Sequence, residues 1–314
     1  MNENHEQNQP IHYVAVDISK NTLQIQDDKG SFTVANDSSG IAKLIIHLKA
    51  CHHPLAVFEA TGGYERPLLE ALRKAGLPMA MVNPARVRDF ARSEGIRAKT
   101  DPIDAKMILA FAQSKQLEPM AAASAPCIKL AALLDRRDHL TEQMAREKNR
   151  LQNSEAFIHR SIKRMIRVLE KELAAIEKEI QSLVDSDPGL KTRAEIIEEV
   201  KGVGPVTAWT LLAYLGEMEN LSRNGIVAMA GVAPFNRDSG KFSGKRCIQG
   251  GRAKVRKCLY MAAHTAARCN PVIAPYVKGL RDRGKPYKCA IVAAMRKILI
   301  HIQSLLKKAQ LSPC

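Results

Sequence analysis

The chain has 314 residues, which is enough for two domains or one large one with a well-buried core. Its formal net charge is +16 and its sequence pI is near 9.6, which indicates a polyanionic partner such as nucleic acid. Aromatic residues make up only 4% of the chain, so contacts to the phosphate backbone are expected rather than base stacking.

The seven cysteines are scattered and form no C-x-x-C pair. This pattern argues against a disulfide framework or a structural zinc site, and it favours a reducing cytoplasm. The polar N-terminus does not resemble a signal peptide, and no apolar run approaches the roughly 20 residues of a membrane span. We therefore expect a soluble protein of the cytoplasm.

Residues 1–10 are rich in Asn, Glu and Gln and predict a disordered tail. Residues 11–125 then show three strand patterns in succession, followed by alternating helix and strand patterns. That order predicts an α/β domain of the RNase H-like type. The expected elements are strands at Ile11–Ile18, Thr22–Gln26, Ser31–Ala35, Leu55–Glu59 and Pro78–Val82, with helices at Ser38–Ala50, Tyr64–Ala75 and from Pro84 onward.

Residues 126–187 predict an α-helical connector. Its apolar residues step by four and three without a break, which is the pattern of a coiled-coil seam. We expect this seam to bring protomers together, and the alternative is an antiparallel hairpin within one chain. The seam residues are Ile162, Ile166, Leu169, Leu173, Ile176, Ile180 and Leu183, extended less regularly upstream by Leu140, Met144, Leu151 and Ile158.

Residues 188–314 predict a mainly α-helical C-terminal domain. Gly202 and Gly204 lie between two helix patterns, Ala194–Val200 and Val206–Leu215, in the arrangement of a helix-hairpin-helix. In such a turn the glycines let backbone N–H groups meet a phosphate near a helix N-terminus. A glycine-rich turn that serves helix packing alone is the alternative.

Two basic stretches are expected to contact nucleic acid. One precedes residue 100 and the other has eight basic residues between Arg237 and Lys257 against one acid. A solvated surface is the alternative for both, although glycines within the second favour close approach to phosphates. The residues that we assign to nucleic acid are Arg86, Arg88, Arg92, Arg97, Lys99, Arg237, Lys241, Lys245, Arg246 and Arg252.

Four acids are the candidate metal ligands. Asp17 and Glu59 end apolar strand patterns, and Asp101 and Asp104 lie three residues apart at a predicted helix start, where they would share a face. Helix capping alone would also explain Asp101 and Asp104. If the four carboxylates converge, hard divalent cations such as Mg²⁺ or Mn²⁺ would relieve their repulsion.

Several motifs together resemble the DEDD-type insertion-sequence transposases, also known as bridge-RNA-guided serine recombinases. The resemblance covers nearly the whole chain, in the family's order and spacing. It is carried by the segments Val14–Asp17, Phe58–Tyr64, Asn83–Ala91, Lys99–Ala105, Gly231–Pro234 and Asp238–Gly240. It implies a RuvC-like N-terminal domain, a coiled-coil connector and a C-terminal transposase domain.

The resemblance also implies roles for individual residues. Asp17, Glu59, Asp101 and Asp104 match the metal-binding tetrad, and Ser239 matches a catalytic serine that links covalently to DNA. The family's partners are donor and target DNA and a structured bridge RNA. On local grounds alone Ser243 rivals Ser239, and either could be a turn serine. The acids and the serine lie on different domains, so one site would be assembled within a chain or between protomers of a dimer or tetramer.

These features lead to three hypotheses. The first is a transposase that cuts and rejoins DNA through a serine–phosphodiester intermediate, with Mg²⁺ at the acids and an RNA choosing the sites. The second is a RuvC-like nuclease that hydrolyses DNA with metal-activated water. The third is a non-catalytic nucleic-acid-binding protein whose acids only cap helices.

Overall fold

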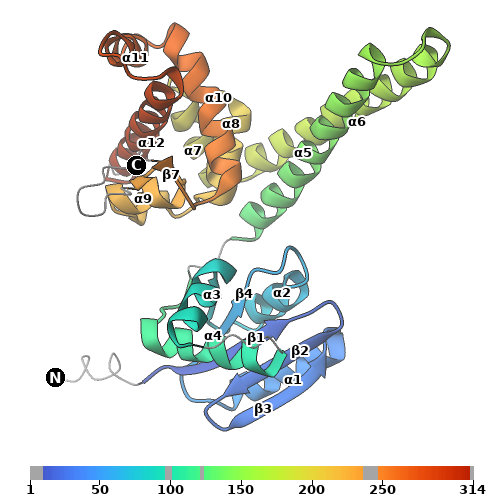
Figure 1. Cartoon of the computed structure of the whole chain (residues 1–314), viewed down its shortest axis with the longest axis vertical. Coiled ribbons are helices and arrows are strands. Elements are labelled where there is room, and N and C mark those ends of the chain that lie inside the picture. Colours follow the sequence, from blue (N-terminus) through green and yellow to red (C-terminus); the bar gives the residue numbers. More distant parts are fainter. Residues whose placement is uncertain (1–9, 96–100, 121–123, 236–246, 312–314) are drawn as a thin grey trace. The chain divides into compact units, whose positions relative to one another are not determined.

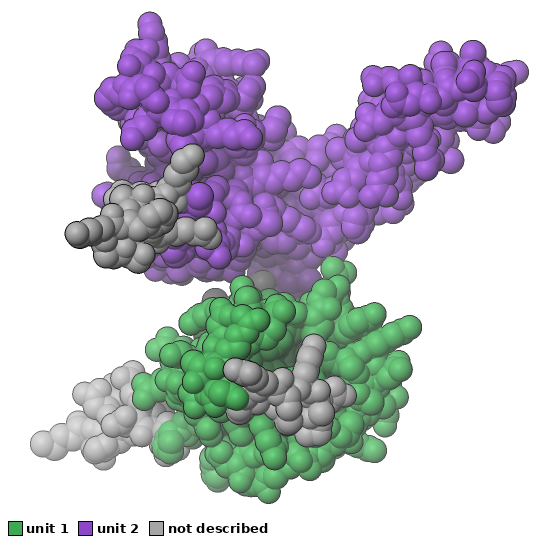
Figure 2. All heavy atoms as spheres, viewed as in Figure 1, with its two compact units in different colours: residues 1–122 green, residues 123–314 purple. Residues whose placement is uncertain are grey.

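The computed structural model describes residues 10–95, 101–120, 124–235 and 247–311, with the backbone alone at 101–103 and 310–311. The described chain forms two compact units, residues 1–122 and 123–314 (Figures 1 and 2). The predicted N-terminal tail lies outside the described residues, except for Pro10.

A five-stranded mixed sheet forms the centre of the first unit. Its order is β3-β2-β1-β4-β5, with β1, β2 and β3 antiparallel and β4 and β5 parallel to β1. This is the strand order of an RNase H-like domain, which confirms the predicted mixed α/β class. The strands are β1 (His12–Ile18), β2 (Thr22–Asp27), β3 (Gly30–Ala35), β4 (Pro54–Glu59) and β5 (Met79–Val82).

Each face of this sheet is covered by a pair of helices. Alternate residues of β1 and β4 enter opposite cores, since successive side chains of a strand point to opposite faces. Val14, Val16 and Phe58 belong to one core, whereas Ala15 and Val57 belong to the other. The first core is closed by α1 (Ser38–Lys49) and α2 (Arg66–Lys74), and the second by α3 (Pro84–Ser93) and α4 (Asp101–Lys115).

The second unit is almost entirely helical, as predicted. A large core joins its elements, and Trp209 belongs to that core with 5% of its surface exposed. The helices are α5 (Ala125–Gln152), α6 (His159–Ser186), α7 (Pro188–Glu198), α8 (Pro205–Tyr214), α9 (Arg223–Met229), α10 (Ala253–Cys269), α11 (Ile273–Asp282) and α12 (Tyr287–Leu311). A small ribbon pairs β6 (Pro234–Phe235) with β7 (Cys247–Ile248).

The expected continuous helix upstream of Ile162 is wrong, because α5 ends at Gln152 and a short 3₁₀ turn, Ala156–Ile158, precedes α6. The two helices instead form an antiparallel hairpin within one chain, the alternative that the sequence had left open (Figure 1). Ion pairs link them in antiparallel order: Lys129 with Glu179, Arg137 with Glu177, and Lys148 with Glu170. A contact between protomers remains a prediction.

Helix α12 is the one described helix that is long and apolar enough to cross a membrane, over Tyr287–Ala309. The expectation that no apolar run approaches the length of a membrane span was therefore wrong. Half of the apolar window is buried inside the protein, and Ile291, Met295 and Ile298 belong to the core of the second unit. These features are those of a core helix.

Candidate functional site

Asp17 and Glu59 meet at the carboxyl edge of the sheet. Strands β1 and β4 are parallel and pair Val16 with Phe58, so the next residue of each strand is an acid. Neighbouring strands lie about 4.8 Å apart. Val16 and Phe58 face the core under α1 and α2, which turns Asp17 and Glu59 to the other face of the sheet. Both acids are partly buried.

Helix α4 brings Asp104 to the same edge and face. The Tyr13 hydroxyl, near the start of β1, donates to the Leu117 carbonyl just beyond the end of α4 (3.1 Å). The helix therefore runs antiparallel to β1, and its first turn lies where β1 ends. Asp104 precedes Ile108 by one turn, and Ile108 is fully buried in the core between α4 and the sheet. Asp104 thus lies on the sheet-facing side of its helix.

Asp101 is the first residue of α4, as the sequence predicted for the helix start. Its backbone is one turn from Asp104, and its side chain lies outside the described residues. Three of the four predicted acids therefore come from β1, β4 and α4 to one face at one edge, and the backbone of the fourth begins the same helix. Carboxylate oxygens arranged in this way are ligands of the kind that Mg²⁺ and Mn²⁺ prefer.

Sequence reasoning missed Glu65, which holds the loop after Glu59. Its carboxylate accepts hydrogen bonds from the Gly63 N–H (2.8 Å), the Thr61 N–H (3.2 Å) and the Thr61 hydroxyl (2.5 Å). Burial alone raises the pKa of the Glu65 carboxyl, but the hydrogen bonds from Thr61 and Gly63 outweigh it and the pKa is lowered. The signal was local, because an acid two residues after Thr-Gly-Gly can close such a turn.

The predicted basic edge of the first unit is only partly described. Arg86, Arg88 and Arg92 lie exposed on α3, which begins directly after β5 on the carboxyl edge of the sheet. The Arg86 guanidinium lies 5.5 Å from the centre of the Phe111 ring, and Arg92 pairs with Asp89 at 3.4 Å. Arg97 and Lys99 lie outside the described residues.

Most of the predicted basic loop of the second unit also falls outside the described residues, namely Arg237, Ser239, Lys241, Ser243, Lys245 and Arg246. Arg252 is described, and it already has protein partners. It donates to the Tyr214 carbonyl and pairs with Glu217 at 3.0 Å.

A groove of 1240 Å³ lies beside the ribbon that flanks residues 236–246. Its apolar lining includes Tyr260, Met261 and Tyr276, and within the described part of the chain no acid lines it. Five cations line it as well: Arg256, Lys257, Lys285, Lys288 and Arg296. The sequence had marked only Arg256 and Lys257 of this set, because the cations come together from α10, α12 and the loop before α12.

The glycine turn between α7 and α8 has two different surroundings. Gly202 has a φ of +100°, and a Cβ there would lie 2.6 Å from the Ala266 Cα of α10. Gly204 precedes the first residue of α8 and faces open space. Packing against α10 thus explains Gly202, while phosphate binding by the turn remains a prediction.

The strand order and the acids at the carboxyl edge define the first unit as an RNase H-like domain with a candidate divalent-metal site. One family model, described as a transposase of the DEDD type of IS110, matches residues 12–154. A second, described as the transposase IS116/IS110/IS902 family, matches residues 194–278. The two ranges together cover most of the chain, and the chain belongs to this family of insertion-element transposases.

Individual relatives agree with this family. The pilin gene-inverting proteins of Moraxella lacunata and Moraxella bovis are each 28% identical over 299 residues, covering 91% of this chain and 93% of theirs. An uncharacterized 42 kDa protein of insertion element IS900 from Mycobacterium paratuberculosis is 32% identical, covering 44% of this chain and 36% of its own.

Among solved structures, T. thermophilus RuvC in complex with a Holliday junction substrate aligns with 35% of this chain and 100% of its own. The TM-score is 0.27 and the identity 14%. The fold assignment rests on the sheet order of the first unit.

Proposed function

We propose that this transposase cuts and rejoins DNA through a covalent serine–phosphodiester link, with Ser239 as the nucleophile. The observation that carries the proposal is the meeting of Asp17, Glu59 and the first turn of α4 at one sheet edge. Helix capping would explain only Asp101 and Asp104, which lie at the start of α4. Carboxylates gathered from two strands and a helix are better explained as ligands of a divalent cation that serves phosphoryl transfer.

Asp17, Glu59, Asp101 and Asp104 would hold Mg²⁺ or Mn²⁺, and the bound ion supplies Lewis-acid stabilisation of charge on the phosphate oxygens. The Ser239 hydroxyl loses its proton as its oxygen bonds to phosphorus, and the bond from phosphorus to a deoxyribose oxygen breaks. That oxygen takes up a proton and leaves as a hydroxyl. Rejoining is the reverse reaction with a new DNA end.

The name of the Moraxella relatives favours rejoining over hydrolysis. Inverting a gene requires that every cut strand be joined again, and a covalent protein–DNA link retains the phosphodiester for that step. Hydrolysis by metal-activated water releases a free phosphate end instead. The family and the covering relatives therefore support the serine route for this chain more than the nuclease alternative.

The cation-lined groove of the second unit supports a DNA-binding role beside the segment that carries Ser239. Lys285, Lys288 and Arg296 supply positive charge for phosphates, while Tyr260 and Tyr276 supply apolar surface for sugars or bases. Arg86, Arg88 and Arg92 of α3 offer a second basic surface, at the edge where the acids lie. We assign that surface to the structured guide RNA.

We also propose a dimer or tetramer that acts in the cytoplasm at the nucleoid. Phe157, Met165 and Val168 expose 84%, 51% and 52% of their surfaces around the start of α6, and such apolar side chains fit a contact with another protomer. In such an assembly the acids of one chain would act together with Ser239 of another. Mixing a Ser239→Ala chain with an Asp101→Ala chain tests this: recovered strand exchange supports a shared site, and none counts against it.

The experiment that tests the proposed reaction uses DNA of the insertion element with its flanks, the RNA that copurifies with the protein, and Mg²⁺. On a denaturing gel, the wild-type protein should shift a labelled strand as a covalent adduct, and Ser239→Ala should not. Ser243→Ala is the matched control and should retain the adduct. Cleaved DNA without any adduct would favour the nuclease, and DNA binding without cleavage would favour the binding protein.

Sequencing the copurified RNA tests the guide. One dominant structured RNA that matches the element's own flanks is expected. A mixture of cellular RNA fragments would count against a dedicated guide.

A further inference from the structure

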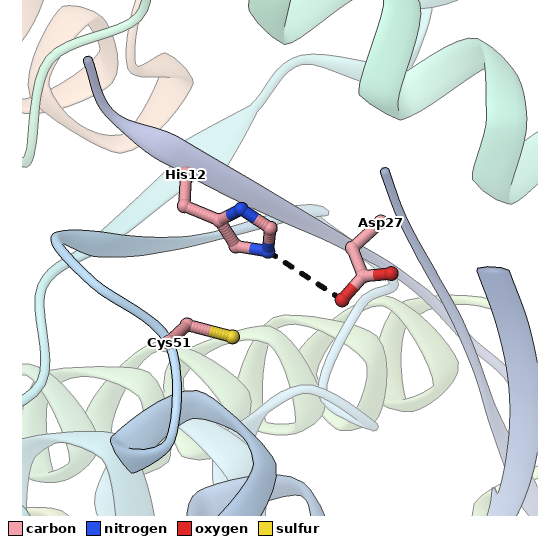
Figure 3. A group of neighbouring side chains, drawn as sticks. All are labelled: His12, Asp27 and Cys51. Carbon is pink, nitrogen blue, oxygen red and sulfur yellow. Dashed lines mark ion pairs between the residues drawn. The ribbon is translucent and has the colours of Figure 1, made fainter. Parts of the chain in front are cut away.

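A second group of metal-ligand side chains lies at the opposite edge of the same sheet. His12 is the first residue of β1, Asp27 is the last residue of β2, and Cys51 follows α1 (Figure 3). Because β1 and β2 are antiparallel, the start of one lies beside the end of the other. This edge holds the amino end of β1, whereas Asp17 and Glu59 lie at the carboxyl edge.

The three side chains converge closely enough to share one ion. One donor atom from each of them lies within 4.8 Å of the others. In a tetrahedral zinc site, metal–ligand bonds of about 2.0–2.3 Å place the donor atoms roughly 3.3–3.8 Å apart. The His12 Nε2 and the Asp27 Oδ2 are already 3.5 Å apart (Figure 3). The Cys51 Sγ lies within 4.8 Å of both, so it would need to approach by up to about 1–1.5 Å to reach ligand spacing.

One donor atom has an ion-pair contact but no hydrogen bond of normal geometry. The His12 Nε2 is buried, and no described residue forms a hydrogen bond with it. At 3.5 Å, the Asp27 oxygen is beyond a normal hydrogen bond to a ring nitrogen. An unsatisfied buried nitrogen is uncommon in native proteins, and an ion is one of its ordinary explanations.

The Asp27 carboxylate is buried and held in a fixed orientation. Its side chain is 2% exposed, and its Oδ1 accepts hydrogen bonds from the backbone N–H groups of Lys29 (2.9 Å) and Gly30 (3.1 Å). Its Oδ2 lies 2.8 Å from the Nε2 of His47. Carboxylate ligands of metals are commonly oriented by such outer hydrogen bonds.

His47 holds the Asp27 carboxylate in place and is not one of the three ligands. It lies on α1, four residues before Cys51, and its Nε2 contacts the Asp27 carboxylate. Its ring packs against Phe32 at a centroid distance of 5.0 Å, which fixes its position beside Asp27.

We propose that His12, Asp27 and Cys51 bind a zinc ion that fastens β1, β2 and the end of α1 together, with His47 orienting Asp27. Imidazole nitrogen and thiolate sulfur suit Zn²⁺ and not Mg²⁺. This ion is therefore distinct in chemistry and position from the cation of the carboxylate edge. The proposal does not depend on the proposed transposition chemistry, because its evidence lies at the opposite edge of the sheet.

The test uses Co²⁺ as a spectroscopic substitute for Zn²⁺ in the purified full chain. Cobalt bound to a thiolate gives a near-ultraviolet charge-transfer band, which the wild-type protein should show at one ion per chain. In Cys51→Ala and His12→Gln the band should be absent, and a Co²⁺ titration should no longer saturate at one ion per chain. Cys269→Ala, at an exposed cysteine of α10, and Asp104→Asn, at the carboxylate edge, should both retain it.

Thermal unfolding then separates loss of the ion from loss of the fold. Zn²⁺ should raise the melting temperature of the chelator-treated wild-type protein by roughly 5 °C or more, and Mg²⁺ should not. Cys51→Ala should have the same melting temperature as the chelator-treated wild-type protein, and Zn²⁺ should not raise it. An absent cobalt–thiolate band in the wild type would overturn the proposal even if the variants failed to fold. So would a band that survives Cys51→Ala or disappears in Cys269→Ala.

Discussion

The two units of this transposase carry opposite kinds of chemistry on different kinds of scaffold. The first unit presents acids from the ends of two parallel strands and from the start of one helix, so a rigid sheet fixes their positions. The second presents cations from two helices and the loop before α12 around a wide groove. A sheet edge suits ions that need close, defined ligands, whereas a helical groove suits a long polyanion that is bound at many points.

The largest expected effect follows from removing one charge at the acid edge. Asp104→Asn should lower strand cleavage by about a thousandfold or more, because a carboxylate ligand becomes a neutral amide. DNA binding and melting temperature should change little. Asp89→Asn, at an exposed acid of α3, is the control and should cleave normally. If Asp104→Asn cleaved DNA as fast as the wild-type protein across a Mg²⁺ titration, the acids would not be metal ligands of the reaction.

The glycine turn of the second unit should respond differently at its two glycines. Gly202→Ala should destabilise the protein by about 3 kcal/mol, because the new Cβ meets α10 and the backbone is left-handed. Gly204→Ala should change the free energy of unfolding by less than about 1 kcal/mol, since its Cβ meets open space.

Chemical denaturation measures both changes, and fluorescence anisotropy with labelled DNA then tests the turn's second role. Weaker binding by the stable Gly204→Ala variant would support phosphate contact. Unchanged binding would leave packing as the turn's whole purpose.

Reversing a charge in the groove should have a smaller effect, confined to DNA binding. Lys288→Glu should weaken DNA binding roughly tenfold and reduce the slope of log affinity against log salt by about one. Lys178→Glu, on the exposed side of α6, changes net charge equally and should have much less effect. Equal losses in the two variants would mean that only overall charge matters.

The smallest expected effect concerns the loop after Glu59. Glu65→Gln should cost about 1 kcal/mol of stability at neutral pH, through weakened hydrogen bonds from Thr61 and Gly63. The pKa of Glu65 is lower in the folded chain than in the unfolded one, so the ionised carboxylate stabilises the fold above the unfolded pKa. This contribution should shrink as the pH falls below the unfolded pKa and disappear below the lower, folded-state pKa. Denaturation curves at pH 7 and pH 3 check it, and an equal difference at both would contradict it.

The first unit was largely predictable because its signals are local. Apolar runs located the strands to within one or two residues, and an acid directly after each run marked the carboxyl edge. Only the sheet register could show that Val16 pairs with Phe58, and hence that Asp17 and Glu59 meet. Helix direction likewise had to come from the contact between Tyr13 and Leu117.

The second unit was less predictable because its patterns suit more than one partner. The seam of α6 packs equally well against another chain or against α5 of its own, and Asn153 and Ser154 gave only a weak signal for the break between them. The groove depends on tertiary packing of α10, α11 and α12, which no local spacing records. The same is true of His12, Asp27 and Cys51, which lie far apart in the chain.

The most direct measurement identifies the residue that is joined to DNA. A covalent adduct trimmed with nuclease and digested with trypsin separates the two rival serines, because cleavage after Arg237, Lys241 and Lys245 puts them on different peptides. Mass spectrometry should find a nucleotide on the peptide Asp238–Lys241 of the wild type, and Asp104→Asn should give no such product. A nucleotide on Phe242–Lys245 would contradict the assignment of Ser239, and cleaved DNA without a modified peptide would contradict the serine intermediate itself.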